Sequence, residues 1–534
     1  MEGEYGPLED YDAIDAAITK HRGIVQQLCT LRNSRAPIWR IPDEILSRIF
    51  LFMVSEHFYE VYGNMGCGPH QPYKWTQIIC VCRRWHRVCF ATRALWAFVD
   101  IGHPKRTQTL LRLSGSVPLT IISASFEKDA LHLCLAEMSR IRHFLFEPPY
   151  PLEYLDSDDG RPYVPPTTGI CSVRSLFLDL ATPAFTRLFV SSSLTHLRCG
   201  PMDPQFSVEE MLAVLTSTPL LVELELDSAL QCIRSPDSYN APPGRQAVAL
   251  PALRRMEVED SSAAGVSCAV LLQSLEVPSQ ASLSFDFASS EYIPQEVAVV
   301  IGILRRIASK IFGHGNLPRT CYIRKEEHTY RGQSRESDLT VELWPAVYHL
   351  PELPDPSGAP SRPGHVTITL GVTRSPHWPE NALIDAFLST LPLSDVSTFA
   401  VHLPTFPRDV WTQLARISNA THVSASSHTL AYGLAKALAA PSDPPFPKLQ
   451  ALTLGDVRWD EGLLDQGGSD VPLSTRCRDA LRARLAQGIP LRSIALRVAT
   501  EVHETELKAL QDAGLVVTVE CSLCRDEKAG SSAS

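Results

Sequence analysis

Few residues of this sequence have the type and spacing that covalent chemistry requires. The stretch Gly-Val-Ser-Cys-Ala at residues 265–269 follows a strand-like run and precedes a helix-like one, which faintly suggests the nucleophile turn of a serine hydrolase. That turn needs a second glycine where Ala269 stands, and no glycine cluster upstream could bind an oxyanion. No matching acid and histidine can be named. The sequence therefore predicts that Ser267 is a core residue and that the chain has no catalytic site.

Metal and phosphate sites are equally incomplete. Cys521 and Cys524 have the spacing of a zinc-ligand pair, but zinc needs four ligands and no second pair lies nearby. Cys80 and Cys82 are separated by one residue and would lie on different faces of a helix. The glycine-rich stretch at residues 63–68 lacks the Lys-Ser/Thr ending of a phosphate-binding loop. We expect no bound metal and no cofactor.

The composition is that of a folded protein with a large core. Of 534 residues, 44% are hydrophobic and 20% are charged, which excludes general disorder. A net charge of −10 argues against nucleic acid as the main ligand, because phosphate binding needs a basic surface. There is no apolar run of about 18 residues and no signal peptide, so no membrane span is expected. The 14 cysteines are scattered, like buried thiols of a reducing compartment, which predicts an intracellular, cytoplasmic or nuclear protein.

Two short amphipathic helices are predicted between residues 37 and 96. Pro42 suits the first turn of a helix, and Asp43 and Glu44 place negative charge at its positive end. About 60 residues form only a marginal core, so such a unit should pack against something else. The apolar stripe of the first helix is Ile45, Leu46, Ile49, Phe50 and Met53; that of the second is Ile78, Cys82, Trp85 and Cys89, widened by Val81 and Val88. The residues expected on the solvated side of the second helix are Arg83, Arg84, His86 and Arg87.

The identities of the residues in these two helices, and not only their spacing, are informative. Ile-Pro-Asp-Glu-Ile-Leu at 41–46, Ile-Phe at 49–50, Val-Cys-Arg-Arg-Trp at 81–85 and Leu-Trp at 95–96 together closely resemble an F-box, in particular that of fungal F-box-like proteins. F-box domains are helical modules that dock on a Skp-type adaptor, which joins them to a cullin-based ubiquitin ligase. Two departures are Ile41, where leucine is commoner, and an unusually long connection at residues 56–74. The resemblance implies that the adaptor is bound through Ile41, Pro42, Ile45, Leu46, Ile49, Phe50, Val81, Cys82 and Trp85, some of which must instead form the module's own core.

A further helix is predicted over residues 10–33. Its apolar positions step by four and three, at Ile14, Ile18, His21, Val25 and Leu28. A stable coiled coil needs more heptads than these. The preferred interpretation is a helix packed against the F-box, and the alternative is a dimerising helix.

After residue 96 the pattern changes to strands and helices. A strand is predicted at 98–101, a helix at 106–113 and a strand at 119–123. After these, a three-residue phrase, in which two apolar residues flank one residue of any type, is repeated along the chain. Its early copies are about 21, 27, 32 and 27 residues apart, close to the period of leucine-rich repeats, although later intervals reach about 83 residues. The copies begin at Leu176, Leu197, Leu224, Met256, Leu283, Val366, Phe399, Val423, Leu452, Ile494 and Val517.

Some copies carry a fuller signature. Residues 221–226 and 449–454 resemble the Leu-x-x-Leu-x-Leu core of a leucine-rich repeat, although the asparagine that normally follows is missing. Stacked strand–helix repeats would form a solenoid; the alternative is a non-repetitive α/β domain. Helix-like runs lie at 208–217, 382–391, 475–487 and 504–513. The polar or proline-rich stretches expected to be surface loops or partly disordered are 147–169, 231–247, 313–337 (in which 324–328 should be solvated) and 351–364, with a frayed tail at 525–534.

The sequence thus predicts an α+β or α/β protein with a small helical module ahead of a repeat body. Its parts would be an N-terminal helix (1–36), an F-box domain (37–100), a degenerate leucine-rich-repeat-like solenoid (101–520) and a disordered tail (521–534). The function implied by the resemblance is substrate recognition for a cullin ubiquitin ligase, with a Skp-type adaptor and a target protein as partners. The alternatives are an interaction scaffold whose F-box engages no ligase and, more remotely, a hydrolase acting through Ser267.

Overall fold

The computed structural model describes residues 11–63, 73–123, 127–146, 171–202, 204–232, 247–259, 265–287, 302, 318–330, 333–344, 366–372, 391, 393–402, 411, 414, 417, 419–440, 445–459, 461–464, 470–489, 491–497, 499–500 and 502–520. The chain divides into two compact units, Met1–Leu176 and Phe177–Ser534. Each unit is described by itself.

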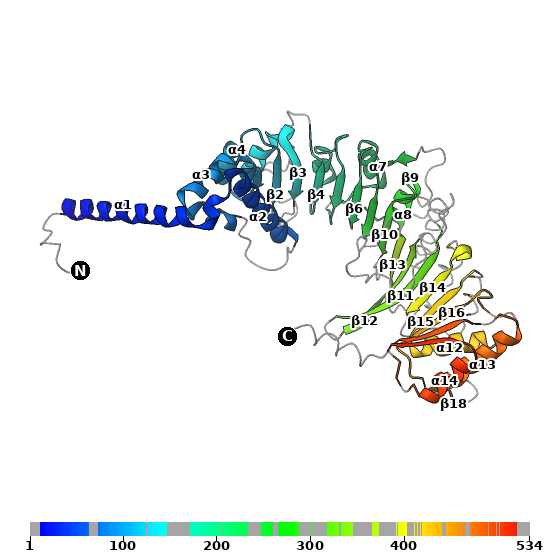
Figure 1. Ribbon diagram of the computed structural model, residues 1–534. Helices are drawn as coiled ribbons and strands as arrows, with labels where there is room; N and C mark the ends of the chain where they lie inside the picture. Colours follow the sequence, from blue (N-terminus) through cyan, green and yellow to red (C-terminus); the bar gives the residue numbers. More distant parts are fainter. Residues whose placement is uncertain are drawn as a thin grey trace. The chain divides into compact units, whose positions relative to one another are not determined.

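The first unit begins with helices (Figure 1). They are α1 (Tyr11–Arg35), α2 (Asp43–Gly63) and α3 (Arg83–Ala91), with the 3-10 turns η1 (Pro37–Arg40), η2 (Lys74–Cys80) and η3 (Arg93–Ala97). As predicted, α2 begins after Pro42 with two acidic residues in its first turn. It continues to Gly63, so residues 56–63 belong to the helix and not, as expected, to the connection. The reason is that no glycine or proline occurs in α2 before Gly63.

The helices of this unit share a compact apolar core. The inner side of α2 buries Leu46, Phe50 and Val54. The Trp96 indole nitrogen donates a hydrogen bond to the Cys89 carbonyl at 3.0 Å, which fixes η3 against α3. The Trp75 and Trp96 rings pack with their centroids 5.5 Å apart. The other buried residues of η2, α3 and η3 are Ile78, Val88, Cys89, Leu95 and Ala97.

Helix α1 does not pack closely against the other helices, as the sequence had predicted it would. It is present over slightly more than the predicted range, but none of its 25 residues is buried. Its junction with η1 and one hydrogen bond, from the Arg83 guanidinium to the Gln26 side chain at 2.8 Å, connect it to the other helices. The expectation that α1 packs against the helical module along its apolar stripe is therefore wrong.

The first unit ends in a small parallel sheet. Its strands β1 (Phe98–Asp100), β2 (Leu119–Ser123) and β3 (Ile141–Phe146) pair in chain order. Helices α4 (Pro104–Ser114) and α5 (Lys128–Leu135) pack against each other, and Ile121 and Phe144 are fully buried. The turn η4 (Met138–Arg140) precedes β3, and β4 (Ser175–Leu178) contains the boundary between the units.

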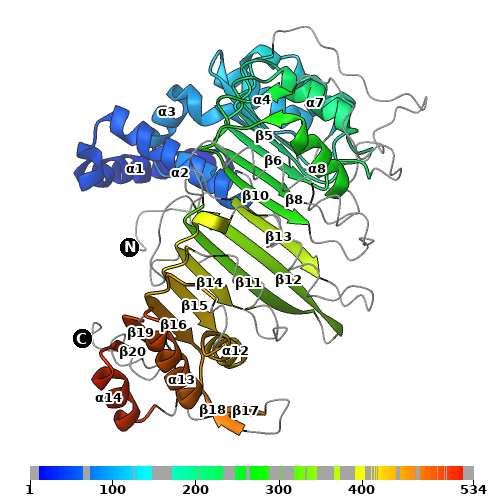
Figure 2. The same cartoon turned by 90° about the vertical axis from the view of Figure 1, so that its right-hand side faces the viewer.

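The second unit continues the parallel pattern. Strands β5 (His196–Cys199), β6 (Glu223–Asp227), β8 (Arg255–Glu259) and β10 (Ser282–Phe287) lie side by side in this order. Their apolar residues stand in register, because Leu197 pairs with Leu224 and Leu224 with Met256. Helices α7 (Val208–Thr216) and α8 (Gly265–Gln273) lie together beside these strands (Figure 2). The short elements here are α6 (Pro183–Arg187) and the paired β7 (Val248–Ala249) and β9 (Leu275–Glu276).

A long antiparallel hairpin interrupts the parallel order. It consists of β11 (Thr320–Tyr330) and β12 (Gln333–Trp344), and β12 also pairs antiparallel with β13 (Val366–Val372). This corrects the prediction that residues 313–337 form a surface loop. Cys321 and Ile323 alternate with polar residues and are buried, while Arg324 approaches Glu342 of β12 at 3.5 Å. The polar half of this alternation hid the strand in the sequence.

The end of the second unit is again parallel. Strands β14 (Thr398–His402), β15 (His422–Ser426), β16 (Ala451–Gly455), β19 (Ser493–Arg497) and β20 (Val516–Glu520) pair in chain order, and β14 also pairs with β11. Helices α12 (His428–Leu438) and α13 (Leu473–Ala486) pack on each other. The remaining described elements are η8 (Leu393–Asp395), α14 (Glu504–Asp512) and the hairpin of β17 (Gly462–Leu464) and β18 (Asp470–Pro472).

All eleven copies of the apolar phrase lie in strands, and those in the second unit from Leu197 onward occupy a mixed, mostly parallel sheet. The helices predicted near 208–217, 475–487 and 504–513 are α7, α13 and α14. The predicted stretches 147–169, 351–364, 382–390 and 521–534, and most of 231–247, lie outside the described residues. The protein is thus a mixed α/β protein whose strands are mostly parallel.

Candidate protein-docking surface

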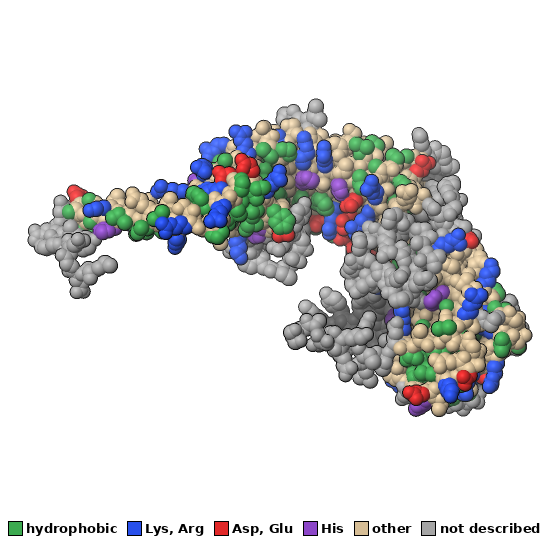
Figure 3. Space-filling view, viewed as in Figure 1, with side chains coloured by type: hydrophobic (Ala, Val, Ile, Leu, Met, Phe, Trp, Pro, Cys, Tyr) green, Lys and Arg blue, Asp and Glu red, His purple; other side chains and the backbone are tan. Residues whose placement is uncertain are grey.

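Helix α2 carries two apolar stripes, and only one of them faces the core. Positions 46, 50 and 54 form the buried stripe. Positions one residue earlier or later point about 100° away around the helix. Ile45, Ile49 and Met53 directly precede the three buried residues and are 44%, 41% and 44% exposed, and Phe52, two positions from both Phe50 and Val54, is 62% exposed. We call these four residues the outer stripe; Figure 3 shows hydrophobic side chains gathered over this part of the unit.

The structure divides the nine residues that the F-box resemblance assigned to an adaptor. Leu46 and Phe50 are buried in the module, so their side chains cannot touch a partner directly. Trp85 is half-buried and its ring meets that of Phe50 edge-on at 4.9 Å. Cys82 begins α3 as its N-cap, where its sulfur accepts the Trp85 backbone N–H at 3.5 Å. Ile41 is half-buried, and the exposed members are Pro42, Ile45, Ile49 and Val81.

One arginine fixes the angle between the two helices. Arg84 of α3 donates from Nε to the Asp43 carboxylate at the start of α2, at 2.8 Å, and from Nη1 to the Trp39 carbonyl at 2.6 Å. Its third donor binds the Ile41 carbonyl, and its guanidinium lies over the Trp39 ring at 5.1 Å from the centroid. The sequence placed Arg84 on a solvated face, which is wrong, since its side chain is only 10% exposed.

The negative charge of Asp43 pairs with the positive charges of Arg84 and Arg87. The hydrogen bond from Arg84, with the positive charges of Arg84 and Arg87, holds the pKa of Asp43 below its ordinary value. A lowered folded-state pKa means that the ion pair contributes fully at neutral pH. The contribution is lost only as the pH falls through that lowered pKa. Because Arg87 and half of Asp43 are exposed, solvent screens much of the attraction.

A groove of about 500 Å³ lies beside this contact. It lies where α1, η1, η2 and α3 meet, and its apolar lining residues include Trp39, Ile79 and Val81. Arg83, Arg84 and His86 add donors along the α3 side. The module therefore offers a partner both an apolar helix stripe and a groove with basic donors.

Of the residues considered for covalent or metal chemistry, Cys80 and Cys82 line this groove, and Ser267 belongs to the second unit. Ser267 is fully buried in the first turn of α8, and its hydroxyl donates to the Gln231 carbonyl. A hydrolase nucleophile needs an accessible oxygen. Cys521 and Cys524 lie outside the described residues. Among the residues that the structure describes, no three His, Cys, Asp or Glu are grouped so that they could hold a metal ion.

Sequence reasoning overlooked a charged surface on the second unit. The residues between the buried positions of β6 and β8 face the opposite side of the sheet, and in register these include Asp227 beside Glu259. Burial first, and then repulsion between neighbouring carboxylates, raises the pKa of Glu225 and Glu259. Arg198 lies 3.6 Å from Glu225. The acidic residues alternating with apolar ones at 223–227 and 257–259 were the signal for this surface.

Comparison of the sequence with known proteins does not assign the chain to a family. The chain matches no protein-family model and no curated protein. Within the described part of the chain, no helix is both long enough and apolar enough to cross a membrane. Any functional proposal therefore rests on the residues and surfaces above.

Proposed function

We propose that this chain is the substrate-recognition subunit of an SCF-type cullin ubiquitin ligase, with residues 37–100 acting as an F-box that docks on a Skp-type adaptor. The observation that carries the proposal is the outer stripe of α2. A helix whose only role was to close the module's core would need one apolar stripe, whereas α2 has a second one in solvent. Exposed apolar patches on folded domains commonly mark protein interfaces.

The outer stripe is large enough to contribute substantially to binding. Fully burying an Ile, Phe or Met side chain contributes about 1.5–3 kcal/mol, so covering the exposed half of four such residues contributes roughly 4 kcal/mol. A few desolvated apolar anchors usually supply most of the binding energy of an interface. In this proposal Ile45 and Ile49 are those anchors, with Val81 and Pro42 beside them, while Leu46, Phe50 and Trp85 support the helix from within.

The proposed role of the body is to bind a target protein. Outside the segment of β11, β12 and β13, its parallel strands follow one another in chain order, with helices between several of them, and this order supports the interpretation as a degenerate leucine-rich-repeat solenoid. The chain itself needs no catalytic residue, because tethering raises the effective concentration of the target near the ubiquitin-carrying enzyme. An intracellular location belongs to the same proposal.

Two alternatives predict different results. A scaffold with the same helical module would keep the outer stripe but bind no ligase adaptor. A hydrolase acting through Ser267 would lose esterase activity on Ser267→Ala, and the buried position of Ser267 disfavours it.

Isothermal titration of the full chain with a purified Skp-type adaptor tests the proposal. We expect one adaptor per chain and a Kd of about 1 µM or tighter, which corresponds to about −8 kcal/mol. An absence of binding at ~100 µM of both proteins, with the chain folded by circular dichroism, would reject the ligase proposal in favour of the scaffold.

A further inference from the structure

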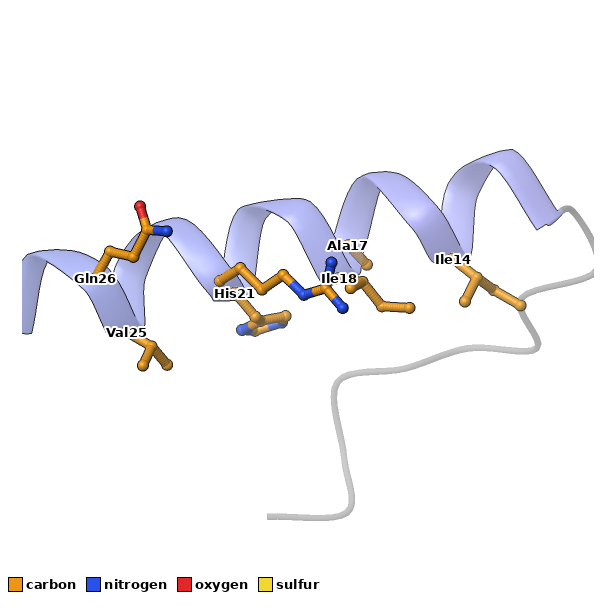
Figure 4. A pocket seen from close by; sticks show the side chains of 7 residues that line it. Ile14, Ala17, Ile18, His21, Val25 and Gln26 are labelled. Carbon is orange, nitrogen blue, oxygen red and sulfur yellow. The ribbon is translucent and has the colours of Figure 1, made fainter. Parts of the chain in front are cut away.

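Helix α1 carries an apolar stripe that its own unit leaves in solvent. Ile14, Ile18, His21 and Val25 point to the same side of the helix, whereas Gln26 points away (Figure 4). Further along the helix, Leu28 and Leu31 are 61% and 52% exposed. Ile24 lies on the same side, at helical spacing from Leu28. The stripe therefore runs for about five turns of a 25-residue helix.

Such a helix gains little stability from its own sequence. Gly23 stands in its middle, where glycine costs about 1 kcal/mol relative to alanine. Isoleucine, valine and threonine are also weaker helix formers than leucine or alanine. Most helical stability in proteins comes from packing of an apolar face. Because none of the residues of α1 is buried, this packing has to come from another molecule.

Among the described residues of the unit, α1 contacts the other helices toward its C-terminal end. There Gln26 accepts the hydrogen bond from Arg83, and Cys29 and Asn33 line the groove next to α3. Figure 1 shows the N-terminal half of α1 extending away from α2 and α3 within the first unit. The stripe of that half, around Ile14 and Ile18, is thus accessible to a partner helix.

The charges along α1 indicate which partner fits. The first turns of α1 carry two acidic residues, Asp12 and Asp15. All the fully charged residues after them are basic: Lys20, Arg22, Arg32 and Arg35. Two parallel copies would set like charges against each other at both ends. Two antiparallel copies set the acidic end of each helix against the basic end of the other. We propose that α1 is a self-association helix that pairs antiparallel with α1 of a second copy of this chain.

The apolar residues are compatible with the same two-fold arrangement. With the axis near His21, Ile14 lies opposite Leu28 of the second copy, and Ile18 lies opposite Ile24. Ala17 then faces Val25, a small residue against a larger one. Two helices of about 37 Å would bury on the order of 1,000 Å², the lower limit for a specific interface. The dimer should therefore be one of micromolar affinity.

Sedimentation equilibrium of the full chain between about 1 and 100 µM tests the pairing. The expected limiting mass is twice the 59.0 kDa of one chain. Ile18→Glu/Leu28→Glu should leave a monomer over the whole range. The matched control, Thr19→Glu/Thr30→Glu, adds the same charge on the opposite side of the helix and should still dimerise. A monomeric wild type, a higher oligomer, or a dimer that survives the stripe substitutions would overturn the proposal.

Charge reversal tests the orientation. Asp12→Lys/Asp15→Lys makes both ends of α1 basic, and Arg32→Glu/Arg35→Glu makes both ends acidic. In an antiparallel dimer each variant alone should pair at least ten-fold more weakly than the wild type, and an equimolar mixture should restore pairing. Parallel helices already repel at both ends, so single variants that pair as well as wild type would contradict the antiparallel geometry.

Adaptor binding and self-association can be measured separately with the stripe variant. The stripe variant Ile18→Glu/Leu28→Glu should bind a Skp-type adaptor with the same affinity as the wild type in the titration above. A variant that stays folded but loses adaptor binding would assign the stripe to the adaptor and not to a second copy. A failure of the wild type to bind the adaptor would leave the dimer measurement unaffected.

Discussion

Replacement of Ile45 and Ile49 by aspartate is expected to weaken adaptor binding at least 100-fold, or by about 2.7 kcal/mol, without unfolding the module. Each change removes an apolar anchor and places a charge where the adaptor would exclude water. Both side chains are more than 40% exposed in the free chain, so the folded state tolerates the charge. Titration calorimetry gives the Kd, and circular dichroism verifies the fold.

The matched control for this experiment lies on the second unit. Leu220→Asp/Leu485→Asp puts the same charges at two exposed leucines that are 54% and 67% accessible. This variant should bind the adaptor as tightly as the wild type. Equal losses in the two double variants would show that added charge, and not the outer stripe, governs binding.

Phe50→Ala is expected to lower the free energy of unfolding of the helical module by about 3–4 kcal/mol. Phe50 is 1% exposed, and its ring packs edge-on against Trp85, so alanine leaves a cavity between α2 and α3. The Cys89 thiol provides a local measurement, because it is fully buried and burial raises its pKa to about 11. Thiol labelling of Cys89 in increasing urea should have its midpoint lowered by about 1–2 M.

Phe52→Ala is the control, two positions along the same helix. Phe52 is 62% exposed, so the same truncation leaves no cavity and should change stability by less than about 1 kcal/mol. If Phe52→Ala destabilised the module as much as Phe50→Ala, the division of α2 into an inner and an outer stripe would be wrong.

The strands were the most predictable part of this protein. Each copy of the repeated phrase places two apolar side chains on one side of a strand, as Leu224 and Leu226 do in β6, and this local pattern is enough to identify a strand. The hairpin of β11 and β12 was missed because its alternate residues are charged. Arg324 and Glu342 meet across the two strands at 3.5 Å, a pairing that depends on tertiary contacts.

The docking surface was predictable as a segment but not residue by residue. Leu46 and Ile49 occupy the same broad stripe in the sequence, and only the positions of η2, α3 and η3 decide that Leu46 is buried and Ile49 exposed. The role of Arg84 depends on the same geometry, because two of its acceptors are backbone carbonyls of η1 and the residue after it. A sequence pattern does not reveal such acceptors.

Amide hydrogen exchange of the full chain, with and without a saturating Skp-type adaptor, tests the central claim most directly. The account predicts slower exchange in the first three turns of α2, residues 43–54, and in residues 79–82, with unchanged exchange in β6 and β8 of the second unit. Protection confined to the second unit, or no protection of α2 when the adaptor is bound, would contradict it.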